Sequence, residues 1–332
     1  MTTPVLRARQ AALVVNPIKT DASRLAAMLT ALSVAAGWTE PLILETSVDD
    51  PGQQVTRQAL TAGVSAVLVA GGDGTVRAVT EAMARSGVPL AIIPSGTGNL
   101  LARNLRLPLG NSLAVMQAVF EGTTHPIDIG WAEITRPDGE KHEHAFVVLA
   151  GIGLDADMIA NTRADLKKSM GWVAYVDGAA RSLPGAKPVR VVYQVDEHRL
   201  HTAKVHSMLF ANCGTLPAGI ALIPDASIAD GDLDIVLIKA RGPFGWLAVW
   251  RTVWWQNSVL RRSEPGRQMI KLTGTNGSVR FLSGVKAEAA VQRPTSVELD
   301  GDEFGLAVNI RCRIDAAALR IVIPTGHDLT GI

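Results

Sequence analysis

Short apolar segments alternate with longer amphipathic segments over the first third of the chain. The apolar segments cover 11–17, 41–46, 65–70 and 89–94. Segments with helical spacing of apolar residues follow them, over 21–37, 50–63, 75–86 and from Leu100 onward. Strands that are apolar on both faces are typical of a parallel sheet covered by helices on both sides. The pattern therefore predicts an α/β domain with three layers.

From about residue 127 the pattern changes to short strand-like segments separated by turn residues. These segments cover 188–196, 204–212, 233–240, 267–274, 278–283, 296–301 and 305–310. A helical pattern over 162–183 interrupts them, and the last apolar strand, 319–324, fits either domain. The second part of the chain is therefore predicted to be a β-rich domain.

Composition narrows the class of protein. The chain has 332 residues, of which 47% are hydrophobic, which is enough for two domains. A net charge of +1 gives no general reason to bind nucleic acid. The two cysteines, Cys213 and Cys312, have no paired spacing, so we expect a reduced cytoplasmic setting and no zinc site. The N-terminus has no signal-peptide core, and no apolar run reaches about 18 residues.

A glycine-rich corner, GGDGT at 71–75, follows the third apolar strand and opens a helix. Such a corner presents backbone N–H groups to an anion. Asp73 would repel a phosphate there unless a metal intervened, so a nucleotide with Mg²⁺ reconciles the two features. The alternative is a tight turn whose aspartate caps a helix, and this motif alone leaves both interpretations open.

Two more loops are expected at the same edge of the sheet. PSGTGN at 94–99 also ends a strand and opens a helix, and NPIKT at 16–20 ends the first strand. Parallel strands place all three loops at one carboxyl edge, where ligands of open α/β sheets bind. Neither glycine corner fits GxGxxG or GxxxxGK[ST], so a dehydrogenase or P-loop protein is not favoured.

The motifs together resemble a known family. NPIKT, GGDGTVRAV, PSGTGNLLARNL, DIGW, GIGLDADMI, DASIADGDLDIVLI and VELDGDEF occur in this order. Nearly the whole chain resembles the diacylglycerol kinase catalytic-domain family, and most of all its soluble bacterial lipid kinases. GGDG alone is shared with NAD kinases, whose pattern does not include PSGTGN or DGDLD.

The resemblance implies a fold and a division of the chain. An ATP-binding α/β domain, 1–127, would be completed by 312–332, and a β-sandwich-like domain would cover 128–311. The lipid would enter between the two domains. Residues that match the family's nucleotide site are Asn16, Pro17, Thr20, Thr46, Gly71, Gly72, Asp73, Gly74, Thr75 and Thr97. Thr20 departs from the family pattern, which has glycine there.

The segment SIADGD resembles the family's loop for a structural magnesium ion. The matching ligands are Ser227, Asp230 and Asp232, the last through its backbone carbonyl. Hard oxygen ligands on a tight glycine turn suit Mg²⁺. From the residues alone, a hydrogen-bonded Asx turn before a strand is the competing interpretation. Asp128 and the pair Lys167 and Lys168 resemble an interdomain charge pair, which a solvated helix face explains equally well.

The segment ELDGDE at 298–303 resembles the family's DGE motif. Asp300 matches the general base, and Asp302 matches the glutamate that contacts nucleotide or metal. Glu303 follows directly, so either acid fits the second role. Kinase chemistry needs a carboxylate near the acceptor hydroxyl. A hairpin turn is the alternative, because Asp-Gly between strands is a strong turn signal.

A tryptophan-rich segment, 242–262, is the other unusual feature. A helix would place Trp246, Trp250 and Trp254 on one face, with Arg251, Arg261 and Arg262 nearby. Indoles favour a membrane interface and arginines favour anionic headgroups, so this face predicts transient attachment to an anionic membrane. Packing on the β-rich domain, or a homodimer contact, is the alternative.

These features lead to one expected function. We expect a cytoplasmic, peripherally membrane-associated lipid kinase that uses ATP and Mg²⁺, with diacylglycerol as the default substrate and no nucleic-acid partner. A sphingoid base or another lipid alcohol is the second substrate class. A nucleotide- or lipid-binding regulator without turnover is the alternative of another kind.

Overall fold

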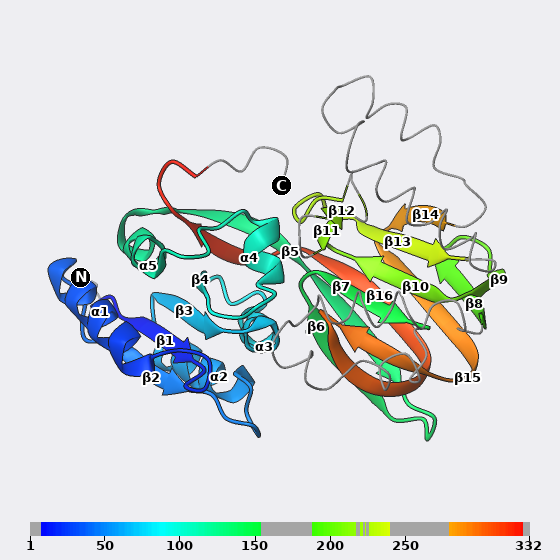
Figure 1. Cartoon of the computed structure of the whole chain (residues 1–332), viewed down its shortest axis with the longest axis horizontal. Helices are drawn as coiled ribbons and strands as arrows, with labels where there is room; N and C mark the ends of the chain where they lie inside the picture. Colours follow the sequence, from blue (N-terminus) through cyan, green and yellow to red (C-terminus); the bar gives the residue numbers. More distant parts are fainter. Residues whose placement is uncertain are drawn as a thin grey trace, which may run out of the picture. The chain divides into compact units, whose positions relative to one another are not determined.

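The computed structural model describes residues 8–153, 188–216, 220–221, 223, 226–239 and 279–327 (Figure 1). The chain divides into two compact units. Unit 1 comprises Met1–Ile127 with Ala317–Ile332, and unit 2 comprises Asp128–Ala316.

Unit 1 is a parallel sheet with helices on both faces, as the apolar pattern predicts. Its strands are β1 (Ala11–Val15), β2 (Leu42–Glu45), β3 (Ala66–Gly71) and β4 (Pro89–Pro94). Its helices are α1 (Ala22–Ala35), α2 (Gln53–Ala62), α3 (Asp73–Met83), α4 (Leu100–Asn104) and α5 (Ser112–Glu121). Neighbouring strands run in the order β2-β1-β3-β4, all parallel. The predicted fold class is confirmed.

Burial explains why this sheet forms. Every residue of β1 and β3 is buried, because helices cover both faces. Side chains of α1 and α5 pack on one face, where Leu13, Leu68 and Ile93 lie in a shared apolar core. The helices α2 and α3 pack against each other and against the strands β1 and β3.

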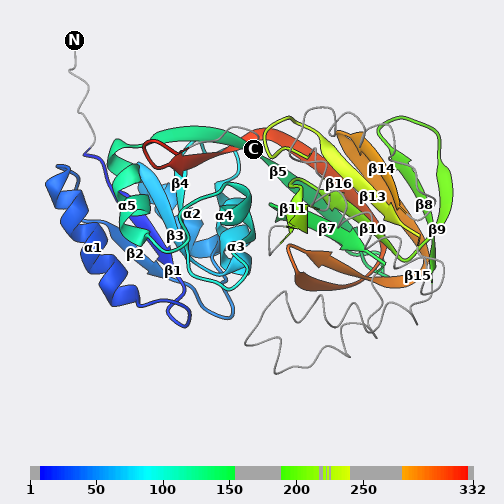
Figure 2. The ribbon, with the colours of Figure 1, turned by 45° about the horizontal axis from the view of Figure 1, so that its top comes forward.

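The last strand of the chain is longer than the sequence pattern indicates. The segments 305–310 and 319–324 lie in one strand, β16 (Asp302–Ile323), because the alternation of buried and exposed residues continues through Arg311–Ile314. Its final residues pair in parallel with β4, with Arg320 opposite Pro89 (Figure 2). The end of the chain therefore extends the sheet of unit 1.

Unit 2 is β-rich. Its strands include β6 (Lys141–Phe146), β7 (Leu149–Ile152), β8 (Val189–Val195), β9 (His201–Val205), β10 (Ser207–Ala211), β11 (Thr215–Leu216), β12 (Ile220–Ala221), β13 (Leu233–Ile238), β14 (Val279–Gly284) and β15 (Lys286–Leu299). Strand β5 (Thr123–Thr135) enters it from unit 1. The strand order β14-β13-β10-β7-β15-β16 is antiparallel throughout.

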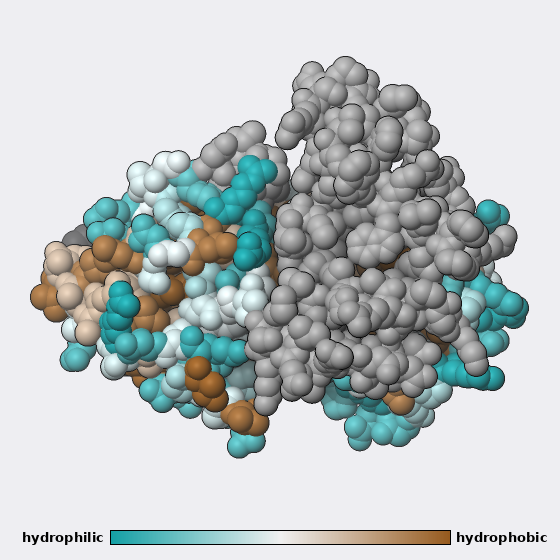
Figure 3. Space-filling model, viewed as in Figure 1, coloured by the Kyte–Doolittle hydropathy of each residue, from teal (hydrophilic) through white to brown (hydrophobic). Residues whose placement is uncertain are grey.

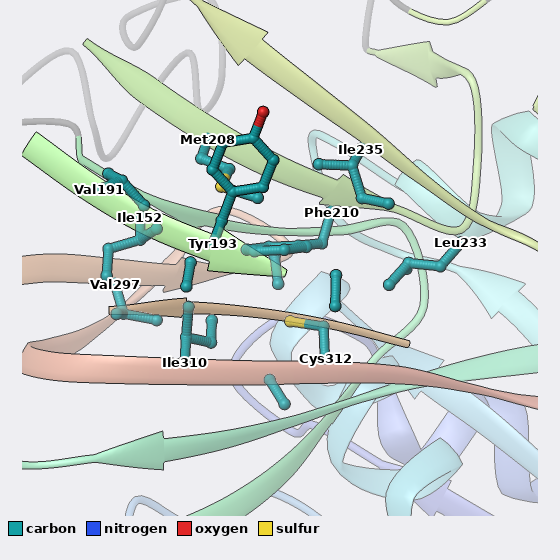
Figure 4. Close-up of a cluster of buried hydrophobic side chains, with 14 of the residues drawn as sticks. Ile152, Val191, Tyr193, Met208, Phe210, Leu233, Ile235, Val297, Ile310 and Cys312 are labelled. Carbon is teal, nitrogen blue, oxygen red and sulfur yellow. The ribbon is translucent and has the colours of Figure 1, made fainter. Parts of the chain in front are cut away.

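The core of unit 2 is built from inward-facing residues of these strands (Figure 4). Tyr193, Phe146 and Phe210 are its largest fully buried side chains. Tyr193 on β8 and Phe210 on β10 point into the same cluster as Ile310 of β16. This core holds the β15–β16 hairpin against β7, which places the turn of that hairpin.

The surface of unit 1 mixes polar and apolar residues on the face that Figure 3 shows. Two large hydrophobic residues, Val48 and Ile18, are 91% and 84% exposed. They follow β2 and β1, at the carboxyl edge of the sheet. Among the described residues, no helix is long and apolar enough to cross a membrane.

Candidate active site

The carboxyl edge of the parallel sheet brings three predicted loops together in unit 1. Each loop continues the backbone hydrogen bonding of the strand that it follows. The Asn16 N–H donates to the Ala70 carbonyl at 2.8 Å, and the Ser95 N–H donates to the Gly71 carbonyl at 3.3 Å. Thr46, predicted beside them, is buried and donates its N–H to the Val15 carbonyl at 2.9 Å.

The first loop, 16–20, closes on Asn16. The Asn16 carbonyl accepts from the N–H of Lys19 and from both the N–H and the hydroxyl of Thr20. The Asn16 side chain accepts from the Ile18 N–H at 3.0 Å, and Pro17 is exposed. Thr20 therefore completes a tight turn through its hydroxyl, which explains how the loop forms without the glycine of the family pattern.

The first two glycines of the GGDGT corner have different surroundings. A Cβ on Gly71 would lie 2.7 Å from the Thr75 Cβ, so the fold itself needs glycine there. A Cβ on Gly72 would meet no atom within 4 Å, and Gly72 has an ordinary φ of −84°. Gly72 is the N-cap of α3, and Gly74 lies in the first turn of that helix. The fold thus leaves open space at the cap of α3.

Asp73 links the two glycine corners. Its carboxylate accepts from the N–H of Asn99 at 3.0 Å and of Leu100 at 2.6 Å, at the start of α4. A Cβ on Gly98 would collide with the Asp73 carboxylate. The aspartate therefore caps a helix, but the helix is α4 and not its own. Asp73 holds the second corner against the first.

Asn99 is a residue of this site that sequence reasoning missed. It has a left-handed φ of 49°, and its side chain both accepts from the Gly96 N–H and donates to the Gly96 carbonyl. The signal was present, because asparagine before a helix commonly tolerates that conformation. Thr97 lies exposed inside the loop that Asn99 closes, and Thr75 is buried with its hydroxyl 3.5 Å from the Asn16 amide.

A pocket of about 390 Å³ adjoins the first loop within unit 1. Thr20 and Ser95 line it from the two loops, and Lys19 and Arg24 add positive charge. Asp21, the N-cap of α1, also lines it. Hydrogen bonds from the Arg24 N–H and from Ser23 lower the pKa of Asp21, so its carboxylate stays ionised.

In unit 2, Asp300 and Gly301 form the turn between β15 and β16. Their φ values are 51° and 87°, as two-residue hairpin turns of the Asp-Gly type require. Asp300 is 4% exposed, and its carboxylate accepts from the N–H groups of Val147, Val148 and Leu149 at 2.8, 2.8 and 3.0 Å. The hairpin interpretation of this motif is therefore correct, and the same residue carries a buried carboxylate.

Asp302 and Glu303 follow the turn on β16, and both are exposed. Asp302 pairs with Leu299 and Glu303 with Glu298 of β15. Consecutive strand residues point to opposite faces, so only one of the two acids can share a face with a given ligand.

The 227–232 loop has the Asx-type turn that the residues alone suggest. The Ser227 hydroxyl accepts from the Ala229 N–H at 3.3 Å, and the Asp230 carboxylate accepts from the Asp232 N–H at 3.1 Å. Burial raises the pKa of Asp230, and the negative charges of Asp232 and Asp128 raise it further. A divalent cation would offset that negative charge, so this oxygen-rich loop fits Mg²⁺.

Other predicted features have a mixed outcome. No cluster of three or more His, Cys, Asp or Glu side chains suited to a metal occurs in the described ranges. Asp128 is buried, and its carboxylate accepts from the Gly231 N–H at 2.7 Å. Its predicted partners, Lys167 and Lys168, lie outside the described residues, as does the whole tryptophan-rich segment 242–262.

Comparison with known proteins decides the family. Residues 10–132 match the diacylglycerol kinase catalytic domain, and residues 147–254 match the YegS C-terminal NAD kinase beta sandwich-like domain. The Pseudomonas aeruginosa protein named "Probable lipid kinase YegS-like" is 30% identical over 85% of this chain and 84% of its own length. The chain belongs to the YegS-like lipid kinase family.

Other members and relatives agree with this assignment. A Mycobacterium tuberculosis protein named diacylglycerol kinase is 31% identical over 55% of this lipid kinase and 57% of its own length. A crystal structure of a diacylglycerol kinase from Bacillus anthracis has a TM-score of 0.72 at 19% identity, over 98% of this chain and 99% of that one. The structural likeness shows the fold, and the family assignment makes the protein a kinase.

Proposed function

We propose that this lipid kinase transfers the γ-phosphoryl group of ATP to a lipid hydroxyl, with diacylglycerol as substrate and phosphatidate as product. The nucleotide binds at the carboxyl edge of the sheet in unit 1. The family assignment and the diacylglycerol kinase name of the mycobacterial relative support the substrate class.

The proposed nucleotide site rests on the open space beside Gly72. The fold itself explains three other glycines of the two corners. A Cβ on Gly71 would meet Thr75, a Cβ on Gly96 would meet the Cα of Gly72, and a Cβ on Gly98 would meet the Asp73 carboxylate. A Cβ on Gly72 itself would meet no atom within 4 Å, and the φ of Gly72 is not strained. A bare backbone at the N-terminus of an 11-residue helix suits a phosphate group.

Two basic side chains beside this corner support phosphate binding. Lys19 and Arg24 line the pocket next to the first loop, where they add positive potential near the phosphates. Mg²⁺, when bound, neutralises charge on the transferred group. Ser227, Asp230 and Asp232 would hold a second, structural Mg²⁺ in unit 2.

Asp300 is proposed as the general base. A base must be ionised to accept the proton of the substrate hydroxyl. The three N–H groups that point at Asp300 stabilise its negative charge and fix its orientation. Asp302 or Glu303 supplies the additional acid that contacts nucleotide or metal.

Membrane attachment is proposed from the sequence. The tryptophans at 246, 250 and 254, with the nearby arginines, would insert at an anionic bilayer surface, where the lipid substrate resides. The exposed Ile18 and Val48 of unit 1 are further apolar side chains suited to that surface.

The nucleotide site is tested with two variants that each introduce a valine side chain. Gly72→Val places a side chain into space that the fold leaves open, so the protein folds and the phosphate is excluded. Ala62→Val is the control, because Ala62 is exposed at the end of α2, which leads into β3 at the amino edge of the sheet, away from the three loops. Calorimetry should show at least a tenfold loss of Mg·ATP affinity in Gly72→Val alone. Equal affinity in both variants and the wild type would place the nucleotide elsewhere.

A further inference from the structure

Hydrogen bonds in unit 2 connect the 227–232 loop to the Asp300 turn, and Asn212 stands between them. Asn212 directly follows β10 and is 1% exposed. Its side-chain nitrogen donates to the Asp128 carbonyl at 3.0 Å and to the Val147 carbonyl at 3.1 Å. The Asp128 carboxylate in turn accepts from the Gly231 N–H. One buried amide therefore contacts Asp128, which binds the 227–232 loop, and the 147–149 segment, which binds Asp300.

Two peptide groups connect Asn212 directly to Asp300. The first joins Val147 to Val148: its carbonyl accepts from the Asn212 amide, and its N–H donates to Asp300 Oδ1. The second joins Val148 to Leu149: its carbonyl accepts from the Asn212 backbone N–H at 2.8 Å, and its N–H donates to the same oxygen. Because each peptide group is planar, holding its carbonyl also fixes the direction of its N–H.

We infer that Asn212 is a positioning residue for the Asp300 carboxylate. The inference rests on the proposed function, in which Asp300 is the general base. Without the Asn212 amide, the Val147 carbonyl keeps only the weaker thiol donor of Cys213 at 3.3 Å. The peptide group between Val147 and Val148 is then less firmly held, and the oxygen of Asp300 that it binds can shift with it. A misplacement of about 1 Å costs about 10²-fold in rate when a reacting group must be aligned.

Stability alone does not explain this amide. Both carbonyl contacts require the nitrogen of the side chain to face them, so the amide orientation is fixed. The Asn212 oxygen then lies buried without a hydrogen-bond partner among the described residues. A buried unpaired acceptor costs free energy, so asparagine is not the residue that stability would favour here.

The test measures kcat and the KM for ATP separately. Asn212→Ala should lower kcat about 10- to 100-fold. The KM for ATP should stay within about twofold, because the nucleotide loops lie in unit 1. Leu237→Ala is the matched control, since Leu237 is a buried residue of β13 whose truncation destabilises unit 2, and its core cluster includes none of the residues 147–149. Equal loss of kcat per folded molecule in both variants would overturn the inference. Asn212→Ser, which keeps one donor, replaces Asn212→Ala if the latter does not fold, and is judged by the same criteria.

A double-mutant cycle with Asp300→Asn separates this inference from the proposed function. If Asn212 acts through Asp300, then Asn212→Ala should have little further effect in an Asp300→Asn background. If Asp300→Asn is strongly impaired and the effects of the two substitutions on kcat are fully additive, the positioning role of Asn212 is overturned and the proposed function is not. Turnover near that of the wild type in Asp300→Asn instead overturns the general-base assignment, on which the inference depends.

Discussion

Asp300, the proposed general base, should also be important for the stability of unit 2. Replacing it with alanine leaves three buried N–H groups without their partner, and each buried unpaired donor costs about 1–3 kcal/mol. Alanine also fits the left-handed φ of 51° poorly, which adds about 1 kcal/mol. Allowing for water that reaches some donors, Asp300→Ala should lower the free energy of unfolding by about 5 kcal/mol.

The substitution Asp300→Asn separates the contribution of the turn conformation from that of the carboxylate charge and its hydrogen bonds. Asp300→Asn keeps the turn conformation and one oxygen acceptor for Val148 and Leu149, but it turns an N–H group toward the Val147 N–H. Because one buried hydrogen bond and the negative charge are lost, Asp300→Asn should lower the free energy of unfolding by about 2 kcal/mol. Asp302→Asn, at an exposed neighbouring position, should change stability little.

The assay is urea unfolding combined with hydrogen exchange at single amides. The amides of Val147, Val148 and Leu149 should be protected in the wild type and should exchange faster in both Asp300 variants. Unfolding midpoints should fall in the order wild type, Asp300→Asn, Asp300→Ala. Identical midpoints, with unprotected amides in the wild type, would refute the hydrogen-bonding account of this turn.

The remaining predictions concern the other loops. Asp73→Ala should weaken Mg·ATP binding and speed exchange of the Leu100 amide, because the second corner loses its anchor; unchanged exchange would contradict this. Gly98→Ala should act in the same direction, by displacing the same carboxylate, and normal ATP affinity would argue against the link. Because the pKa of Asp230 is raised in the folded state, the loop without Mg²⁺ should be most stable below the ordinary aspartate pKa and lose that stability as pH rises through the raised pKa. Above that pH, Mg²⁺ without nucleotide should raise the melting temperature of the wild type but not of Asp230→Ala. Equal Mg²⁺-dependent shifts in melting temperature in both proteins would mean that the loop is an ordinary turn without a metal site. Finally, Trp250→Ala with Trp254→Ala should lose activity on anionic vesicles but keep it on a water-dispersed short-chain lipid; loss of both, with earlier melting, would mean that the indoles are core.

Local pattern predicted unit 1 well. Uniformly apolar strands and helical spacing located β1, β3 and β4 within two residues of their observed ends, because these elements bury their side chains in one simple way. The strands β5, β6 and β7 were missed. Polar and exposed residues occupy much of β5 and β6, so no clear apolar pattern marks them.

The meeting of the three loops at one edge of the sheet and the Asp-Gly hairpin turn could be predicted from the sequence, but the hydrogen bonds within them could not. The sequence left open whether Asp73 lies near a phosphate or caps a helix, and it did not identify the observed partners of Asp73, which are N–H groups 26 and 27 residues away. Asp300 meets N–H groups more than 150 residues away. Backbone partners leave no trace in side-chain identity, so neither contact could be found from motifs. Asn212 escaped notice for the same reason, because its partners are carbonyls.

The central claim is that this protein phosphorylates a lipid hydroxyl with ATP bound at the glycine corners. The most direct measurement is transfer of label from γ-labelled ATP to a panel of dispersed lipid alcohols, which includes diacylglycerol, sphingoid bases and NAD as a non-lipid acceptor. The account predicts Mg²⁺-dependent labelling of diacylglycerol by the wild type and by Ala62→Val, and none by folded Gly72→Val. Folded wild-type protein that binds ATP but labels no lipid alcohol, or that labels only NAD, would contradict it.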